Sequence, residues 1–241
     1  MTESLPPLDE SWSSALAIAA HPDDLEYGTA AAVARWTAHG KRIVYCLATN
    51  GEAGIDALDP AIAGPLREAE ERAGAAVVGV DVVEFLDHRD GVLEYGLPLR
   101  RDIARAVRRH RPEVVITPNY HDKWSSGEPN QADHTALGRA VLDGVRDAAN
   151  RWVFRELLDE GLGPWRVRQL IVTDSSEANT GVDTTDFLDQ GVASLEAHTE
   201  YLRGLETGDL NNPRELLESM ARTAGQRLGV RFALMTEVIT L

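Results

Sequence analysis

The feature that most constrains the fold is an alternation between short apolar runs and segments whose apolar residues recur at helical spacing. The apolar runs show no polar alternation, which is typical of strands buried on both faces of a parallel sheet. Strands are predicted at 14–20, 42–47, 81–86, 113–117, 168–173 and 231–240, and helices at 29–39, 66–78, 97–110, 132–149, 186–203 and 214–228. The pattern predicts one α/β domain over residues 13–241, with a mostly parallel sheet and helices on both faces.

Polar clusters follow four of the predicted strands. They lie at 21–26, 49–52, 87–91 and 119–134. Right-handed crossovers place the loops after parallel strands at one edge of the sheet, and ligands bind at that edge in such folds. The last cluster is long for a connection between a strand and a helix, and long loops in that position are usually functional. We therefore expect the four clusters to converge on one site.

Composition and charge narrow the classes of partner. The chain carries 39 acidic and 24 basic residues, a net charge of −15, which argues against a nucleic-acid or anionic-membrane partner. No apolar run approaches the roughly 20 residues that cross a bilayer. The single cysteine, Cys46, rules out an intramolecular disulfide and a cysteine-rich metal site. Any metal must therefore be held by histidine and carboxylate groups.

The first 12 residues are acidic and contain prolines, with neither the basic region nor the apolar region of a signal peptide. We expect a flexible tail over residues 1–12 and a cytoplasmic protein.

The strongest local feature is the sequence His21-Pro22-Asp23-Asp24, at the end of the first predicted strand. His21 and Asp24 are three residues apart across a turn and can face one cation, since imidazole nitrogen and carboxylate oxygen both suit zinc. His134, just inside a predicted helix after the long loop, is the best candidate for a third ligand. Asp23 lies between two ligands, where it can serve as general base for a water molecule. The alternatives are a turn with an aspartate that caps the next helix, and a capping or surface histidine at 134.

At this point the sequence resembles the LmbE-like, or PIG-L, family of N-acetylglucosaminyl deacetylases. The blocks that carry the resemblance span about 14–205 and are 16–28, 50–54, 67–70, 111–117, 132–138 and 182–198. The first block, which contains His-Pro-Asp-Asp, is specific, and the others gain weight from their order and spacing. The resemblance implies a Rossmann-like fold and a zinc-dependent hydrolase that removes an acyl group, typically acetyl, from the amide nitrogen of an amino sugar.

The resemblance also assigns roles by position. The implied metal ligands are His21, Asp24 and His134. Asp23 is the implied general base, Arg67 an arginine that contacts the sugar, and Asp90 an acidic residue that binds sugar hydroxyls. On their own, Arg67 also fits a solvated helix face and Asp90 a turn before a glycine. Two histidines and one aspartate suit Fe²⁺ as well as Zn²⁺. The resemblance also implies a homo-oligomer.

One departure from the family pattern concerns proton transfer. The family commonly has His-Pro-Asp-His before the third ligand, whereas this chain has Gln131-Ala132-Asp133-His134. Gln131 can donate a hydrogen bond to an oxyanion but cannot act as a general acid. We keep Gln131 and Asp133 as catalytic candidates. Either Asp23 makes both proton transfers or another histidine assists, with His198 the catalytic candidate, His121 a loop residue near the substrate and His88 a weaker choice.

Three other interpretations remain beside an amino-sugar deacetylase. The first keeps the chemistry with another substrate, such as the amide of a sugar-linked thiol conjugate or an acylated natural product. The second is a homologue that binds sugar or metal without turnover, for which Gln131 is the support. A nucleotide-binding domain is disfavoured, because two carboxylates stand where a glycine-rich turn would meet a pyrophosphate.

Overall fold

The computed structural model describes residues 4–124, 126–205 and 212–241. Its seven-stranded sheet has the order β3-β2-β1-β4-β5-β7-β6. The strands are β1 (Ser14–Ala19), β2 (Arg42–Thr49), β3 (Val83–His88), β4 (Val114–Pro118), β5 (Gln169–Thr173), β6 (Thr180–Asp183) and β7 (Ala233–Thr240). The helices are α1 (Ala30–Ala38), α2 (Pro60–Val77), α3 (Leu97–His110), α4 (Ala132–Ala148), α5 (Glu156–Asp159), α6 (Leu188–Glu196), α7 (Thr199–Gly204) and α8 (Pro213–Leu228).

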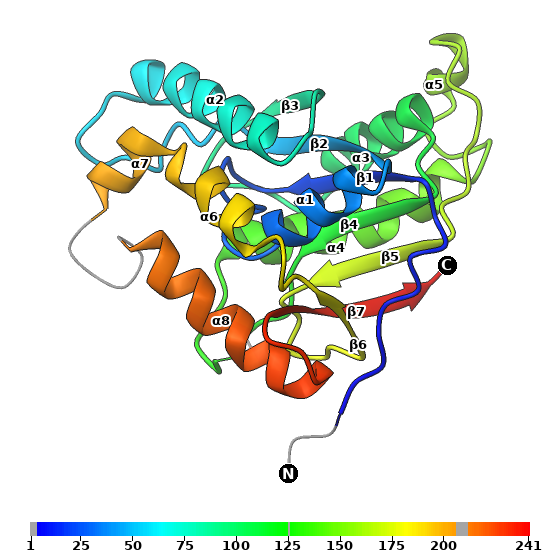
Figure 1. Ribbon diagram of the computed structural model, residues 1–241. Helices are drawn as coiled ribbons and strands as arrows, with labels where there is room; N and C mark the ends of the chain where they lie inside the picture. Colours follow the sequence, from blue (N-terminus) through cyan, green and yellow to red (C-terminus); the bar gives the residue numbers. More distant parts are fainter. Residues whose placement is uncertain (1–3, 125, 206–211) are drawn as a thin grey trace.

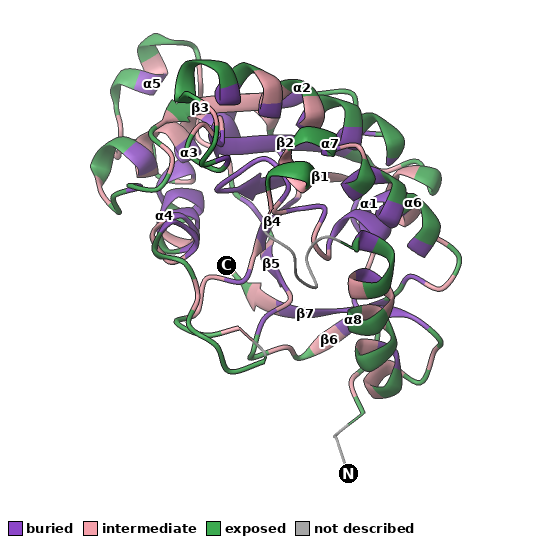
Figure 2. Cartoon of the chain, turned by 90° about the vertical axis from the view of Figure 1, so that its left-hand side faces the viewer, coloured by how far each residue is buried: buried purple, intermediate pink, exposed green. Residues whose placement is uncertain are grey.

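The strand β1 shows why helices cover both faces of the sheet. Its side chains alternate between the two faces, because successive residues of a strand point in opposite directions. Ala15, Ala17 and Ala19 join a core with α1, while Leu16 and Ile18 join a second core with α3 and α4. Figure 2 shows the strands as buried bands between α1 and α6 on one side and α3 and α4 on the other. The predicted fold class is confirmed.

The first five strands pair in parallel, in the order β3-β2-β1-β4-β5. Their carboxyl ends therefore lie at one edge of the sheet, as predicted. The remaining strands differ, since β7 pairs antiparallel with both β5 and β6. At this end of the sheet α8 packs against β7 (Figure 1).

Several boundaries differ from the sequence predictions. Helix α2 begins at Pro60, six residues before its predicted start, because Asp59 caps it through the N–H of Ala61. The predicted helix over 186–203 is two helices, α6 and α7, separated at His198, whose ψ of 57° is not helical. The short elements α5 and β6 were not predicted. With four residues each, they carry too little periodicity to detect.

Residues 4–12 pack against the domain, which corrects the prediction of a flexible tail for this part of the chain. Leu8 and Trp12 are buried in the core beside α1. The Leu8 N–H donates to the Gly181 carbonyl at 2.8 Å, and the Trp12 ring lies 5.2 Å from that of Trp36. Residues 1–3 of the predicted tail lie outside the described residues.

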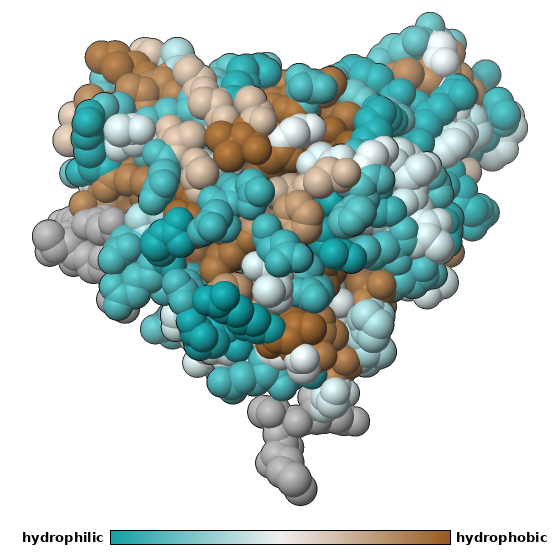
Figure 3. Space-filling view, in the orientation of Figure 1, coloured by the Kyte–Doolittle hydropathy of each residue, from teal (hydrophilic) through white to brown (hydrophobic). Residues whose placement is uncertain are grey.

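The surface is mixed, with apolar side chains gathered over α2 (Figure 3). On that helix Ile62 is 59% exposed and Val77 is 43% exposed. Among the described residues, no helix has the length and apolar character needed to cross a membrane.

Candidate active site

A cleft of about 760 Å³ lies at the carboxyl edge of the parallel strands. This volume lies within the roughly 300–1,000 Å³ typical of small-molecule sites. Residues from the loops after β1, β2, β3 and β4 all line it, so the four predicted polar clusters do converge. Further lining residues follow β5 and belong to α7 and α8.

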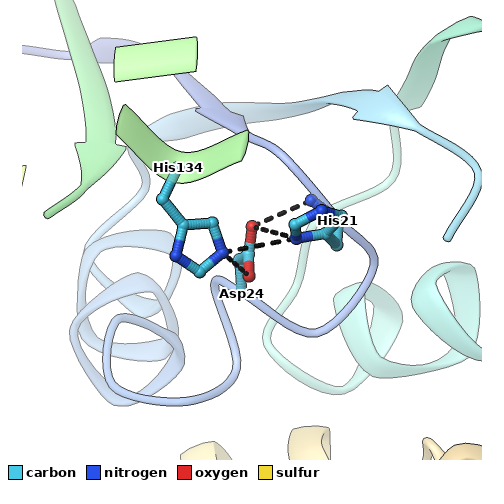
Figure 4. A group of neighbouring side chains, drawn as sticks. All are labelled: His21, Asp24 and His134. Carbon is cyan, nitrogen blue, oxygen red and sulfur yellow. Dashed lines mark hydrogen bonds and ion pairs between the residues drawn. The ribbon is translucent and has the colours of Figure 1, made fainter. Parts of the chain in front are cut away.

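Three side chains at the floor of the cleft turn toward one point. His21 and Asp24 come from the loop after β1, and His134 comes from the first turn of α4 (Figure 4). His134 Nε2 lies 3.3 Å from His21 Nδ1 and 3.0 Å from Asp24 Oδ1. The remaining pair, His21 Nδ1 and Asp24 Oδ2, is 3.5 Å apart. These three residues form the ligand cluster.

The ligand cluster fits a zinc ion. Ligand atoms arranged tetrahedrally at roughly 2.0–2.1 Å from zinc lie about 3.3 Å apart. The separations of 3.3 Å and 3.0 Å from His134 Nε2 to His21 Nδ1 and Asp24 Oδ1 are close to that value, while the 3.5 Å contact of His21 Nδ1 is with the other oxygen of Asp24. Two imidazoles and one carboxylate are a donor set that zinc accepts, and three protein ligands leave a position open toward the cleft.

Outer hydrogen bonds fix which nitrogen of each imidazole faces the cluster. His21 Nε2 contacts the carboxylates of Asp90 at 3.0 Å and Asp133 at 3.2 Å, so Nε2 carries a proton and Nδ1 is left as the donor atom. His134 Nδ1 contacts Asn130 Oδ1 at 3.0 Å, which leaves Nε2 facing the cluster. Asp24 Oδ2 accepts from the N–H groups of Ala20 and His21, which holds the carboxylate in place.

Carboxylates surround His21, and the pKa values reflect this. Burial opposes protonation of His21, but Asp24 and Asp133 raise its pKa to about 12. Burial likewise disfavours the Asp24 carboxylate, whereas His134 and His21 hold its pKa well below the usual range. The same negative field would favour a divalent cation at this point, which would take the place of the proton on His21 Nδ1.

Asp23 is held in an unusual conformation beside the cluster. Its backbone angle φ is +103°, a value that residues other than glycine rarely adopt. The Asp23 N–H donates to Glu71 Oε2 at 3.0 Å, and Arg67 Nη2 donates to Asp23 Oδ1 at 2.8 Å. Burial raises the pKa of Asp23 to about 6, against the lowering effect of Arg67.

The other predicted site residues fall into two groups. Arg67, Asp90 and Gln131 line the cleft. Arg67 is 2% exposed and paired with Asp23, which differs from a solvated helix face. Asp133 lies behind His21, where its carboxylate also accepts from the N–H groups of Gly91 and Leu93, so it does not face the cleft as a proton donor would.

Neither His121 nor His198 is among the described residues that line the cleft, which corrects both predictions. His121 Nε2 is hydrogen-bonded to Glu237 at 2.8 Å. His198 is fully buried between α6 and α7, because the chain turns inward where the predicted helix breaks. His88, the weaker choice, has its Nε2 atom 3.2 Å from Asp102 Oδ2.

His198 belongs to a second group of acidic and imidazole side chains, which we name the buried cluster. Its other members are Glu26 and Glu71, and all three are at most 1% exposed. His198 Nε2 lies 3.9 Å from Glu26 Oε2 and 3.8 Å from Glu71 Oε2. Burial raises the pKa of Glu26 to about 8 and lowers that of His198 to about 3.

Sequence reasoning missed three residues with a direct part in this geometry. Asn130 orients His134, Glu71 binds the Asp23 backbone, and the Tyr201 ring lies 4.2 Å from the Arg67 guanidinium while lining the cleft. Asn130 lies four residues before His134, and Glu71 lies four residues after Arg67. Arg67 and Glu71 both belong to α2, where a spacing of four places two side chains on the same face, and this was the available signal.

Comparisons with known proteins agree with this geometry. A family model described as PIG-L, GlcNAc-PI de-N-acetylase, matches residues 16–145, which include the ligand cluster and Asp23. Diacetylchitobiose deacetylase of Thermococcus kodakarensis is 28% identical over 222 residues, covering 90% of this chain and 80% of the relative. A 1D-myo-inositol 2-acetamido-2-deoxy-α-D-glucopyranoside deacetylase of Kineococcus radiotolerans is 29% identical over 245 residues, covering 76% and 67% respectively.

Among solved structures, N,N′-diacetylchitobiose deacetylase of Pyrococcus horikoshii superposes with a TM-score of 0.85 at 23% identity, covering 96% of this chain and 85% of that one. At that identity the likeness supports the fold. The family match spans more than half of the sequence and contains its most specific motif, and the chain therefore belongs to the PIG-L family.

Proposed function

We propose that this protein is a metal-dependent N-deacetylase that hydrolyses the acetyl amide of an amino sugar or amino-sugar conjugate. The observation that carries the proposal is the ligand cluster with Asp23 beside it, at the floor of a cleft. Membership of the PIG-L family and the activities named for the two curated relatives support the same reaction.

The proposed metal is zinc, held by His21, Asp24 and His134. The separations of 3.3 Å and 3.0 Å from His134 Nε2 to His21 Nδ1 and Asp24 Oδ1 support zinc, although the same donors accept Fe²⁺. A zinc ion held there would supply Lewis-acid chemistry, polarising the amide carbonyl and making water more acidic.

Asp23 is the proposed general base. Its carboxylate lines the cleft, and Arg67 fixes its direction through the 2.8 Å ion pair. In the reaction Asp23 accepts the proton of the attacking water and then delivers it to the departing nitrogen, so that acetate and a free amine leave. The burial of His198 supports Asp23 as the group for both transfers, because that histidine does not reach the cleft.

Gln131 is the proposed donor to the carbonyl oxygen. It lines the cleft directly before α4, and its amide N–H can stabilise negative charge that develops on that oxygen. Asp133 acts through His21 by holding the imidazole in the required orientation.

The lining of the cleft suits a sugar. Asp90 and Arg67 offer an acceptor and a donor for hydroxyl groups, and the rings of Trp124 and Tyr201 offer apolar faces for a pyranose. We propose a soluble acetamido sugar of one or two rings, as the names of the two curated relatives suggest.

The test pairs metal analysis with turnover. Zinc and iron are measured in the purified wild type and in Asp23→Asn, together with amine release from diacetylchitobiose and from the acetamidoglucosyl inositol. We expect about one ion in both proteins and a kcat that is roughly 10²- to 10⁴-fold lower in the variant. Asp81→Asn, which changes an exposed aspartate, is the matched control.

Each failure has a separate meaning. A wild type that holds metal but releases no amine from either sugar would refute the substrate class, and a wild type that binds no metal would refute the ligand cluster. A homo-oligomer and a cytoplasmic location stay predictions from the sequence. The exposed Ile62 and Val77 on α2 give a homo-oligomer a candidate surface.

A further inference from the structure

The loop that carries Asp23 is held from one side by helix α2. Arg67 and Glu71 are four residues apart on α2 and so lie on the same helix face. Arg67 binds the Asp23 side chain, and Glu71 binds the Asp23 backbone N–H. One helix face therefore contacts both ends of this residue.

The backbone of Asp23 needs such a support. A φ of +103° disfavours an L-residue with a side chain, and such conformations persist where the surroundings fix them. The Asp23 carbonyl accepts from the N–H groups of Glu26 and Tyr27 at 2.9 and 3.1 Å, which fixes the far side of the peptide. The Glu71 carboxylate, fully buried, is the partner of the N–H on the near side.

Close packing holds Glu71 where it is. Gly74, one turn further along α2, has no side chain, and a Cβ there would lie 2.9 Å from the Ser194 carbonyl and 3.1 Å from His198 Nε2. Helix α2 can therefore approach α6 closely, and Ser194 donates to the Gly74 carbonyl at 2.8 Å. This contact brings His198 and Glu26 against Glu71.

The geometry of the buried cluster does not suit zinc. Its nitrogen-to-oxygen separations of 3.8 and 3.9 Å exceed the 3.0–3.5 Å found in the ligand cluster. They also exceed the roughly 3.3 Å expected between tetrahedral ligands. The cluster lacks a face on the cleft, since none of its members is among the described lining residues.

We propose that Glu71 is a positioning residue, which holds the Asp23 backbone in its left-handed conformation so that the carboxylate faces the cleft. The buried cluster is the packed support for Glu71. This inference rests on the proposed deacetylase function, because it concerns the placement of the proposed base.

The experiment compares substitutions at Glu71 by kcat, KM, metal content and hydrogen–deuterium exchange of the peptide that contains residues 21–27. Glu71→Gln keeps an oxygen that can accept the Asp23 N–H, whereas Glu71→Met has a similar volume and no such acceptor. We expect Glu71→Met to lower kcat roughly 10- to 100-fold, with KM and metal content unchanged and faster exchange. Glu71→Gln should restore kcat to within a few-fold of wild type.

Two further variants separate positioning from loss of stability. Ser194→Ala removes a hydroxyl from the same packed region without touching Asp23, so it should lower the melting temperature and leave kcat unchanged. Glu71→Asp keeps the carboxyl group on a side chain that is one methylene shorter. This variant replaces Glu71→Met if the latter does not fold. Its kcat should lie below that of Glu71→Gln.

Several results would overturn the proposal. Equal kcat values in Glu71→Met and Glu71→Gln would show that the acceptor does not matter. Loss of a second equivalent of metal in Glu71→Met would make the buried cluster a metal site. If the wild type has no deacetylase activity, the proposed function fails by itself, and the exchange of residues 21–27 still decides whether Glu71 holds this loop.

Discussion

The ligand cluster and the buried cluster are built from the same kinds of side chain, and both depend on the loop after β1. In the ligand cluster, donor atoms lie 3.0–3.5 Å apart and each imidazole has an outer partner that leaves one nitrogen free. In the buried cluster the separations are 3.8 and 3.9 Å, and both nitrogens of His198 lack a hydrogen-bond partner among the described residues. Residue type therefore does not distinguish a candidate metal centre from a packed support, whereas separation, outer partners and access to the cleft do.

The largest expected difference between the clusters is in metal binding. His134→Ala should lose the metal and the activity. The loss of metal affinity should exceed the roughly 10- to 100-fold that removal of an outer hydrogen-bond partner costs. His198→Ala should keep the metal, because His198 is outside the ligand cluster. Elemental analysis of both variants tests this, and a loss of metal from His198→Ala equal to that from His134→Ala would break the comparison.

A smaller effect is expected from the outer partners. Asp133→Asn removes the charge behind His21 and should weaken metal affinity roughly 10- to 100-fold, measured by competition with a chelator. Asp102→Asn is a matched control, because Asp102 contacts His88 at 3.2 Å, the same distance that separates Asp133 from His21. Should both variants weaken metal binding alike, the assigned orienting role of Asp133 is wrong.

The sequence predicted that His21, Asp24 and His134 would meet, because these residues follow strands whose ends lie at one edge of a parallel sheet. It also predicted that Arg67 belongs to the site. It did not predict that Arg67 is buried against Asp23, because a helix face facing a loop from another part of the chain cannot be recognised from spacing alone.

His198 illustrates the other limit of sequence analysis. Helical spacing of apolar residues continues from 186 to 203, so no sequence signal marks the break that turns His198 into the interior. There His198 lies near Glu26 and Glu71, which are more than 100 residues earlier and whose proximity helical spacing does not reveal. Similarly, α5 and β6 are stabilised by their neighbours rather than by a pattern of their own.

The smallest expected effect is on pH-dependent stability. Burial lowers the pKa of His198 to about 3, whereas an unfolded histidine titrates near about 6.5. Between these values the unfolded chain binds a proton that the folded chain does not, so the free energy of unfolding decreases as the pH falls. The charged and titratable groups that face this imidazole are Glu26, Glu71 and Arg67. They are present both in the wild type and in the variant His198→Leu.

From pH 7 to pH 5, wild type should lose about 1–2 kcal/mol more of its free energy of unfolding than His198→Leu. Denaturant unfolding at both pH values measures this difference. Equal losses would mean that His198 is not kept neutral in the folded chain, and the contrast with the ligand cluster would have to be redrawn.

The cleft is lined by residues from both the N-terminal and the C-terminal part of the sequence, which has a consequence for how substrate preference can change within such a family. The ligand cluster and Asp23 all precede residue 135, whereas Tyr201, Leu216 and Met220 reach the same cleft from α7 and α8. The hydrolytic groups therefore lie in the first part of the chain, whereas one part of the cleft wall comes from a separate, later stretch of sequence. Exchange of the C-terminal helices between relatives would reshape that part of the wall while the hydrolytic groups are inherited intact.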